Sequence, residues 1–357
     1  MKLLYFTKYS EIGASSRLRS LQFFPYLRNK GYDITWKPLF NDLYVKRLYS
    51  KKSNLSLRVR SYFNRIFSIL YLFLFKNKYD LIIIEKELLP YFPPIFEFLL
   101  YKRGIRYILD YDDPIFHNYD LHKLKIVRRI LGRKIDIIMG WSSHVFAGNS
   151  YLEDRARRAG AKSHSFLPTV IDLNRYNLEN YFPENEFVVG WIGSPSTIRY
   201  LEDLFPVFKS IHSKYPNFRL NIIGAREQYT QEDFIRYIPW DKMNEVEEIN
   251  KFSIGVMPLH DTPFEKGKCS YKLIQYMGCG KAVIGSSIGS NNQVITNDWN
   301  GFLVKTDEDW KNAIEKYLQH PELIKIHGES GRKRILEIYN IDENIRKMTK
   351  IFQSLND

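Results

Sequence analysis

The stretch Asp80-Leu-Ile-Ile-Ile84 decides the fold class of this chain. Its apolar residues follow one another without polar alternation, a pattern typical of a parallel strand that is buried on both faces. Parallel strands are joined by crossover segments that are usually helices, so helical patterns are expected on either side of it. The stretch therefore indicates an α/β protein.

Short apolar strands separated by helical patterns recur along the whole chain. The repeated strand–helix–strand order predicts two doubly wound parallel sheets in tandem, that is, two Rossmann-like domains. The other predicted strands are Lys2–Thr7, Ile34–Pro38, Tyr107–Asp110, Val145–Ala147, Phe187–Ile192, Leu220–Gly224, Ile254–Met257 and Ala282–Ser286.

Length and one polar stretch predict the domain organisation. A chain of 357 residues suits two domains at about 100–200 residues each. Asn174–Glu186 is polar and irregular and is expected to be the linker, which gives a first domain over 1–178 and a second over 179–339. The chain ends in a helical region, Glu322–Leu355, and we expect its last part, about 340–357, to pack back on the first domain.

Charge is distributed unevenly between the two halves. The formal charge is +13, and residues 1–178 hold 31 Lys/Arg against 15 Asp/Glu, while the remainder is slightly acidic. Such asymmetry predicts that the first half faces something anionic: nucleic acid, a membrane surface or a phosphorylated substrate. No zinc-finger, RNP-like or helix-turn-helix pattern accompanies the charge, so no nucleic-acid partner is expected.

The basic and apolar stretch Leu55–Phe75 has two interpretations. It is either a buried helix with a basic flank or a peripheral helix that lies on anionic lipid through Arg58, Arg60 and Arg65. Its longest apolar run, Ile66–Phe75, is too short for a membrane-spanning helix, which needs about 20 residues.

The N-terminus and the cysteines point to a reducing compartment. The sequence begins directly in a strand with no signal-peptide pattern, and Cys269 and Cys279 are predicted on one helix, too far apart for a disulfide. We expect a cytoplasmic protein, peripheral on the inner face of the cell membrane, whose partner surface is anionic lipid.

Two loops after first-half strands are candidate ligand contacts. Gly13-Ala-Ser-Ser16 lies between the first strand and helix, where glycine lets a backbone approach an anion or a sugar, although a plain turn explains it equally. Arg17 and Arg19 could reinforce such an anion site. Asp112, Asp113 and His117 follow another strand and are candidates to hydrogen-bond a sugar or act on it; the alternative is a helix N-cap cluster.

The most specific segment runs from Pro263 to Gly285. Lysines, among them Lys268 and Lys272, surround a predicted helix N-terminus capped by Ser270, and this arrangement predicts a phosphate cradle. Gln275 is predicted on the same helix. Arg199, at the start of an earlier helix, meets the helix dipole unfavourably, so a nearby anionic ligand is expected there too.

These motifs together resemble the family 4 retaining glycosyltransferases, which have the GT-B fold of two Rossmann-like domains facing across a cleft. The resemblance covers most of the chain. The strings that carry it are Gly13–Arg19, Ala147-Gly-Asn-Ser-Tyr-Leu152, Pro168-Thr-Val-Ile-Asp172, Gly190-Trp-Ile-Gly-Ser-Pro195, Lys268 to Gly280 and Asn300-Gly-Phe-Leu-Val304.

The resemblance implies that the second domain binds a nucleotide-sugar donor. The family's signature is a Glu, seven residues and a second Glu that holds the donor ribose; here the second position is Gln275, the first is Gly267, and Glu265 lies two residues earlier. Gln and Glu are nearly isosteric, so Gln275→Glu is expected to be tolerated. Arg199 matches a position that binds the diphosphate, and His117 matches a family histidine.

The function implied is a retaining hexosyltransferase that moves a sugar to a glycan or lipid-linked saccharide in bacterial surface polysaccharide synthesis. Retaining transfer in this family needs no protein nucleophile, and neither a metal nor a cofactor is expected. The alternatives are a GT-B nucleotide-sugar epimerase or hydrolase, or a non-catalytic protein that binds lipid or nucleic acid.

Overall fold

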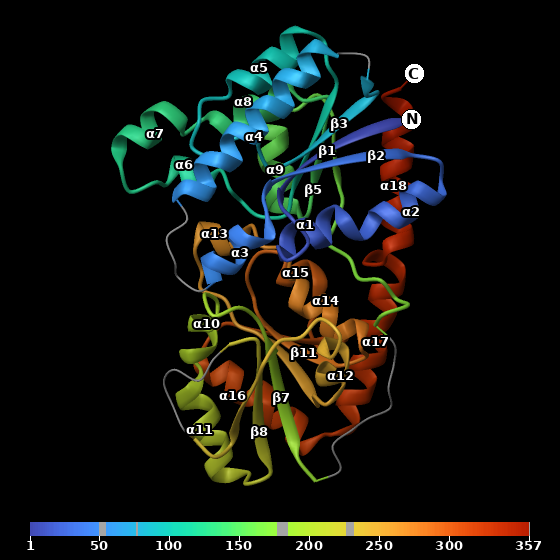
Figure 1. Ribbon diagram of the computed structural model, residues 1–357. Helices are drawn as coiled ribbons and strands as arrows, with labels where there is room; N and C mark the ends of the chain where they lie inside the picture. The colour runs from blue at the N-terminus through green and yellow to red at the C-terminus, as the bar shows by residue number, and fades with distance from the viewer. Residues whose placement is uncertain (50–54, 76–77, 177–184, 226–231, 357) are drawn as a thin grey trace. The chain divides into compact units, whose positions relative to one another are not determined.

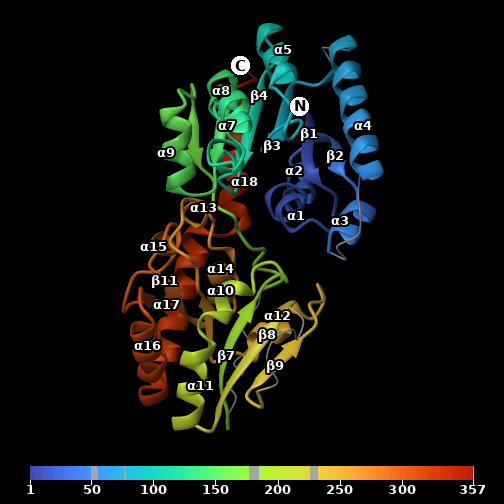
Figure 2. The ribbon, with the colours of Figure 1, turned by 90° about the vertical axis from the view of Figure 1, so that its left-hand side faces the viewer.

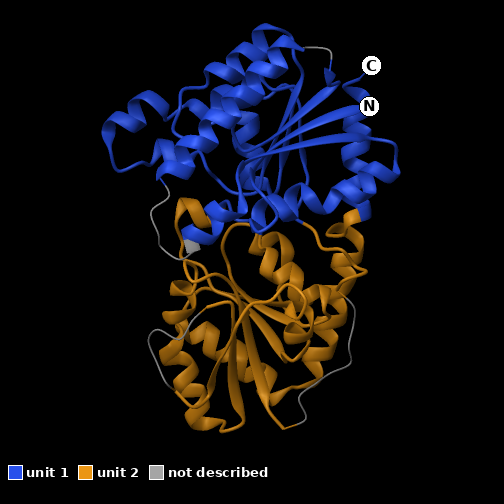
Figure 3. Ribbon diagram, viewed as in Figure 1, with its two compact units in different colours: residues 1–169, 267–269, 342–357 blue, residues 170–266, 270–341 orange. Residues whose placement is uncertain are grey.

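The computed structural model describes residues 1–49, 55–75, 78–176, 185–225 and 232–356, and they form two compact units (Figure 3). Unit 1 comprises residues 1–169, 267–269 and 342–357, and unit 2 comprises residues 170–266 and 270–341. The boundary expected between 178 and 179, and most of the expected linker, lie outside the described residues.

Unit 1 is built on a six-stranded parallel sheet with the order β2-β1-β3-β4-β5-β6, and helices cover both of its faces (Figure 1). Its strands are β1 (Lys2–Tyr9), β2 (Asp33–Phe40), β3 (Leu81–Glu85), β4 (Tyr107–Tyr111), β5 (His144–Ala147) and β6 (His164–Phe166). Its helices are α1 (Ala14–Arg19), the 3-10 turn η1 (Leu21–Phe23), α2 (Phe24–Asn29), α3 (Asp42–Tyr49), α4 (Leu55–Leu74), α5 (Ile95–Lys102), α6 (His117–Asp120), α7 (Lys125–Leu131), α8 (Lys134–Trp141), α9 (Ser150–Arg158) and α18 (Ile341–Ser354).

Unit 2 repeats the plan with a second six-stranded parallel sheet, ordered β12-β11-β10-β7-β8-β9 (Figure 2). Its strands are β7 (Phe187–Ile192), β8 (Phe218–Ile223), β9 (Ile235–Ile238), β10 (Ile254–Met257), β11 (Ala282–Ser286) and β12 (Gly301–Val304). Its helices are α10 (Arg199–Glu202), α11 (Phe205–Lys214), α12 (Glu245–Asn250), α13 (Pro263–Lys266), α14 (Tyr271–Gly278), α15 (Asn291–Val294), α16 (Asp307–Gln319) and α17 (Glu322–Ile338).

The continuous apolar strands form the centre of each core, as expected for parallel strands. All five residues of β3 are buried, and so are those of β4 and β11. The end of the chain joins the first core: Phe352 of α18 is fully buried against the rings of Tyr32 and Phe146. The prediction of two doubly wound parallel sheets is confirmed.

Three strands and one helix differ from the sequence prediction. β6, β9 and β12 were not predicted. Each lies at the edge of its sheet, and β6 and β9 contain polar residues and are not fully buried, so they lack a continuous apolar run. The single helix expected to start at Arg199 is two helices, α10 and α11, and a proline follows the first residue of α11. Cys269 and Cys279 flank α14 instead of lying on it.

The basic stretch Leu55–Phe75 forms α4, which lies over β1 and β2. Ser61, Arg65, Ile69 and Leu72 are its buried residues, one turn apart on a single face. Arg65 is therefore buried against the sheet, whereas the peripheral-helix interpretation placed it on lipid. Its guanidinium donates to the carbonyl oxygens of Thr7 and Lys37, and it stacks 4.6 Å from the Phe6 ring centroid.

Candidate functional site

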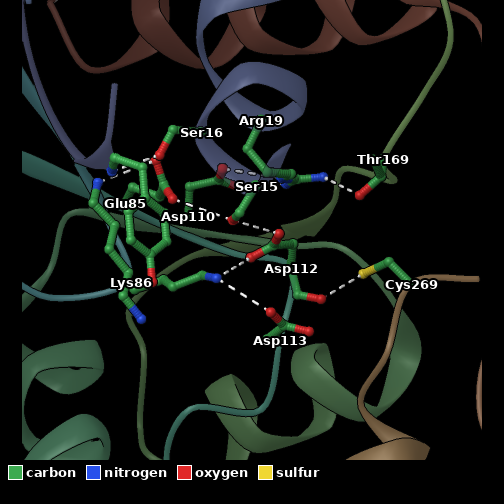
Figure 4. Close-up of polar contacts among 12 residues, drawn as sticks. Ser15, Ser16, Arg19, Glu85, Lys86, Asp110, Asp112, Asp113, Thr169 and Cys269 are labelled. Atoms are coloured by element: carbon green, nitrogen blue, oxygen red, sulfur yellow. Dashed lines mark hydrogen bonds and ion pairs between the residues drawn. The ribbon is translucent and has the colours of Figure 1, made fainter. Parts of the chain in front are cut away.

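Unit 1 gathers charged side chains where β3 and β4 end (Figure 4). Because parallel strands place their carboxyl ends at one edge of a sheet, residues distant in sequence meet there. Glu85 is the last residue of β3, and Asp110 is the last but one of β4. The cluster consists of Ser15, Ser16, Arg19, Glu85, Lys86, Asp110, Asp112 and Asp113.

Arg19 is buried and neutralised by Asp110. Its Nε donates to Asp110 Oδ2 at 3.0 Å, a second bond joins its Nη2 to Oδ1, and its Nη1 donates to the Leu167 carbonyl oxygen at 2.8 Å. The expectation that Arg19 reinforces an anion site is wrong, because a carboxylate on a nearby strand already uses its charge.

Lys86 draws the two predicted aspartates together. Its Nζ lies 2.9 Å from Asp112 Oδ1 and 3.2 Å from Asp113 Oδ2, although only 4% of the residue is exposed. Burial alone would lower the pKa of Lys86, but the two carboxylates outweigh it and hold the pKa well above its usual range. Lys86 has φ 66°, a left-handed conformation that is costly for a residue with a Cβ and is found at functional sites more often than elsewhere.

Glu85 is a buried carboxyl that the sequence interpretation missed. Its Oε1 lies 3.2 Å from Ser15 Oγ, and the same hydroxyl lies 2.7 Å from Asp112 Oδ2. Burial raises the pKa of Glu85 to about 7, against the lowering effect of Lys86. This carboxyl can hold or release a proton near neutral pH. The signal in the sequence was the charged pair Glu85-Lys86 directly after an apolar strand.

The predicted ligand contacts Gly13 and His117 lie in well-filled surroundings. A Cβ at Gly13 would lie 2.2 Å from Tyr9 Cβ, so the close approach of the chain to Tyr9 already requires glycine. Both ring nitrogens of His117 have partners at 2.8 Å, Asp120 Oδ1 and Tyr151 Oη. Among the described residues His117 thus pairs with these two groups and not with the aspartates after β4.

Lys268 belongs to a short segment, residues 267–269, that is part of unit 1. Asn149 Nδ2 donates to the carbonyl oxygens of Gly267 at 2.8 Å and Lys268 at 3.0 Å. The Cys269 thiol donates to the Asp112 carbonyl oxygen at 3.0 Å, and burial raises the pKa of that thiol. Lys268 is therefore grouped with the polar cluster of unit 1, whereas the other predicted residues of its motif lie in unit 2.

In unit 2, Arg199 begins a relay that ends on the buried Glu265. Arg199 Nη2 donates to Tyr200 Oη at 3.0 Å, and that hydroxyl donates to Glu265 Oε1. The Glu265 side chain is 5% exposed, but that of Arg199 is 63% exposed. A guanidinium that is held through one Nη atom on a largely exposed side chain is suited to an anionic ligand.

Lys272 and Ser270 stand at the N-terminus of α14, as predicted. Lys272 Nζ lies 5.1 Å from the Trp191 ring centroid. Ser270 occupies the N-cap position with φ 51°, but its hydroxyl makes no capping bond and lies 2.7 Å from Asn291 Oδ1 and 2.5 Å from Ser290 Oγ. Ser270 thus ties α14 to α15.

Gln275 is buried within a polar network of unit 2. Its Nε2 donates to Tyr176 Oη at 2.8 Å and to Glu245 Oε1 at 3.1 Å, and it is 3% exposed. Arg175 and Trp240 also donate to the Glu245 carboxylate. These partners argue against the expectation that Gln275→Glu is tolerated, because a second carboxylate would face Glu245. No sequence motif pointed to Glu245, so the sequence analysis did not identify it.

The residues that the structure describes contain neither a metal-binding cluster nor a membrane-spanning helix. No group of three or more His, Cys, Asp or Glu side chains there is arranged to hold a metal ion. No helix there is both long and apolar enough to cross a bilayer.

Known glycosyltransferases match part of this chain in sequence. Residues 186–320 match the family described as glycosyl transferases group 1. An uncharacterised glycosyltransferase of Methanocaldococcus jannaschii is 33% identical over 94 residues, 26% of this chain and 24% of that protein. Trehalose synthase of Pyrococcus horikoshii is 24% identical over 170 residues, 43% of this chain and 40% of that protein. The matched region thus spans less than half the length of both relatives.

Solved structures match over nearly the whole chain. Sucrose-phosphate synthase from Thermosynechococcus elongatus superposes with a TM-score of 0.75 at 13% identity, covering 99% of both chains. HepE of Anabaena in complex with UDP gives 0.68 at 12% identity, covering 99% of this chain and all of the other. The predicted GT-B fold is confirmed. The resemblance to glycosyltransferases is confirmed for residues 186–320, which match group 1.

Proposed function

We propose that this chain is a glycosyltransferase that binds a nucleotide-sugar donor through unit 2. One observation carries the proposal: the segment that matches group 1, residues 186–320, contains the Arg199–Tyr200–Glu265 relay and the N-terminus of α14 with Lys272. Arg199 and Lys272 offer positive charge to the diphosphate.

The donor is proposed to be a nucleoside diphosphate sugar, with uridine the first base to test. Structures of Anabaena HepE, which shares the fold, are in complex with UDP and with UDP-glucose. Gln275 and Ser270 are assigned to ordering the donor site, since both are buried and tie α14 to its neighbours. Glu265 holds the relay. Gly13 and Lys268, which belong to unit 1, stay predictions as anion contacts of that unit.

Transfer is proposed to follow the retaining course of family 4. The acceptor oxygen bonds to the anomeric carbon on the face that the diphosphate leaves, the bond to the diphosphate breaks, and the leaving phosphate takes the hydroxyl proton. The main contribution of the protein is then to stabilise charge on the leaving diphosphate and to position the two substrates.

The acceptor is proposed to be a glycan or lipid-linked saccharide of a bacterial surface polysaccharide pathway, held by unit 1. Asp112 and Asp113, fixed by Lys86, present carboxylates that can accept hydrogen bonds from sugar hydroxyls. His117 is the third proposed contact. The basic first half supports the further proposal that the protein lies on the cytoplasmic face of the cell membrane.

Nucleotide binding and product analysis test the proposal. We expect one nucleoside diphosphate to raise the melting temperature, and a radiolabelled sugar from the matching donor to appear in a lipid-extractable or polymeric product. Release of free sugar would identify a hydrolase, and a changed donor sugar an epimerase. If no nucleoside diphosphate binds, the transferase proposal is wrong.

A further inference from the structure

The outward face of α4 carries a continuous apolar stripe. Six residues spaced three or four apart lie on one side of the helix and are exposed to between 45% and 79%. They are Leu55, Val59, Phe63, Phe67, Leu70 and Leu74. At 100° per residue this stripe lies opposite the buried face of Ser61 and Arg65, which faces the sheet. Exposed Leu and Phe in one row are unusual on a soluble surface and mark an interaction site.

Neighbouring residues of unit 1 enlarge the apolar surface. Tyr62 of α4 donates its hydroxyl to the Pro90 carbonyl oxygen at 2.7 Å, which holds the segment before α5 beside the helix. Tyr91 and Ile95 in this region are 57% and 49% exposed. The segment that Tyr62 holds beside α4 thus also exposes apolar side chains.

Charge around the stripe has a single sign. From Leu43 to Tyr79 the sequence holds nine Lys and Arg and no Asp or Glu. Arg60 is exposed on α4 beside the stripe, whereas Arg58, also exposed, lies one turn before Ser61 with its guanidinium 3.4 Å from Tyr44 Oη. An apolar row flanked by cations, with no carboxylate among them, complements a surface that is apolar beneath an anionic layer.

We propose that the outward face of α4 docks on an anionic phospholipid bilayer, with the stripe from Leu55 to Leu74 entering the interface and the flanking cations at the headgroups. The helix lies in the plane of the membrane, because its other face is fixed to β1 and β2 through Arg65. A symmetric dimer through the same face would oppose two sets of like charges. The inference rests on the lipid-linked acceptor proposed above. In it the lipid contacts are Phe63 and Phe67, and Arg65 is not one of them.

Sedimentation with vesicles tests this docking. The full chain is mixed with phosphatidylglycerol vesicles and with phosphatidylcholine vesicles, and the bound fraction is measured. We expect clear binding to phosphatidylglycerol and weak binding to phosphatidylcholine. The double variant Phe63→Ser/Phe67→Ser should bind phosphatidylglycerol about tenfold less tightly or worse, since two rings leave the interface. Ile326→Ser/Leu336→Ser, which removes two residues of unit 2 that are each 52% exposed, is the matched control and should bind as the parent does.

Four readouts make the outcome decisive. Melting temperatures within about 2 °C of the parent show that the variants fold. Equal vesicle binding by the parent and the Phe63/Phe67 variant would overturn the proposal, and so would equal binding to both lipids. A parent dimer that this variant converts to a monomer, without any change in vesicle binding, would assign the face to a second copy instead. In the absence of vesicles, the variant should bind the nucleoside diphosphate as tightly as the parent does. If the parent binds vesicles but no nucleoside diphosphate, the transferase proposal is wrong and the docking proposal stands.

Discussion

Arg19 and Arg199 occupy comparable places in the two units, in the first helix after the first strand, but have opposite surroundings. Arg19 is 2% exposed and paired with Asp110, whereas the Arg199 side chain is 63% exposed and touches a carboxylate only at 3.9 Å. The difference lies in the neighbouring strands. β4 places a carboxylate within reach of Arg19, so this arginine stabilises unit 1. The Arg199 side chain is instead largely exposed, where an anionic ligand could reach it.

The two units also treat buried carboxylates differently. Unit 1 groups Glu85, Asp110 and Asp112 around Lys86 and Arg19, so two cations offset much of the carboxylate charge. In unit 2, Glu245 accepts hydrogen bonds from Gln275 and from Tyr176, which are neutral, as well as from Arg175. Unit 1 should therefore depend on charge and on pH more strongly than unit 2.

The largest expected effect is that of Arg19→Met. Removing the guanidinium leaves Asp110 buried without a cation, and breaking a buried pair in this way costs about 3–5 kcal/mol. Urea unfolding of the variant and the parent at pH 7 measures the loss of stability. Arg199→Met is the matched control and should change stability by less than about 1 kcal/mol, because exposed ion pairs contribute little.

A compensating change sharpens the same test. Arg19→Met/Asp110→Leu removes both charges and should recover much of the loss, since replacing both members of a buried pair is often close to neutral. If the double variant is as unstable as Arg19→Met, then the packing of the Arg19 side chain, and not its charge pairing with Asp110, stabilises this part of unit 1.

The second prediction concerns pH and Glu85. Burial raises its pKa to about 7, while an unfolded Glu titrates near 4.3. Between these values the folded state holds more protons than the unfolded state, so this carboxyl lowers stability as pH rises through the window. Glu85→Gln removes that effect and should gain about 3 kcal/mol on the parent between pH 4.5 and 8. Urea unfolding at several pH values measures the gain, and a constant difference would contradict the raised pKa.

The sequence predicted the strands that are buried on both faces and the position of α14, but not the partners of the charged residues. Continuous apolar runs such as Phe187–Ile192 and Ile254–Met257 define central strands by themselves, and both have the predicted bounds. An ion pair depends on tertiary distance: Arg19 and Asp110 are 91 positions apart. The burial of Gln275 likewise depends on Tyr176, which no local pattern places beside it.

The third prediction tests whether Arg199 is available to a ligand. Arg199→Ala should weaken binding of the nucleoside diphosphate by about 1.5–3 kcal/mol, or roughly tenfold to 150-fold. Isothermal titration with the diphosphate selected by the screen measures it. Lys209→Ala, another largely exposed cation of unit 2 that pairs with Glu232, is the matched control and should bind as the parent does. Unchanged affinity in Arg199→Ala would remove this residue from the donor site.

The smallest effect is expected from Gln275→Glu, which places a charge in the network around Glu245. The new carboxylate would stand where Gln275 Nε2 now lies, 3.1 Å from Glu245 Oε1. Two carboxylates at that distance raise the pKa of one of them, so we expect a loss of about 1–2 kcal/mol at pH 7 that shrinks toward pH 5. Gln275→Met loses the same hydrogen bonds without adding a charge, and its stability relative to the parent should not vary with pH. If the two variants show the same pH profile in urea unfolding, repulsion from Glu245 is not what requires an amide at this position.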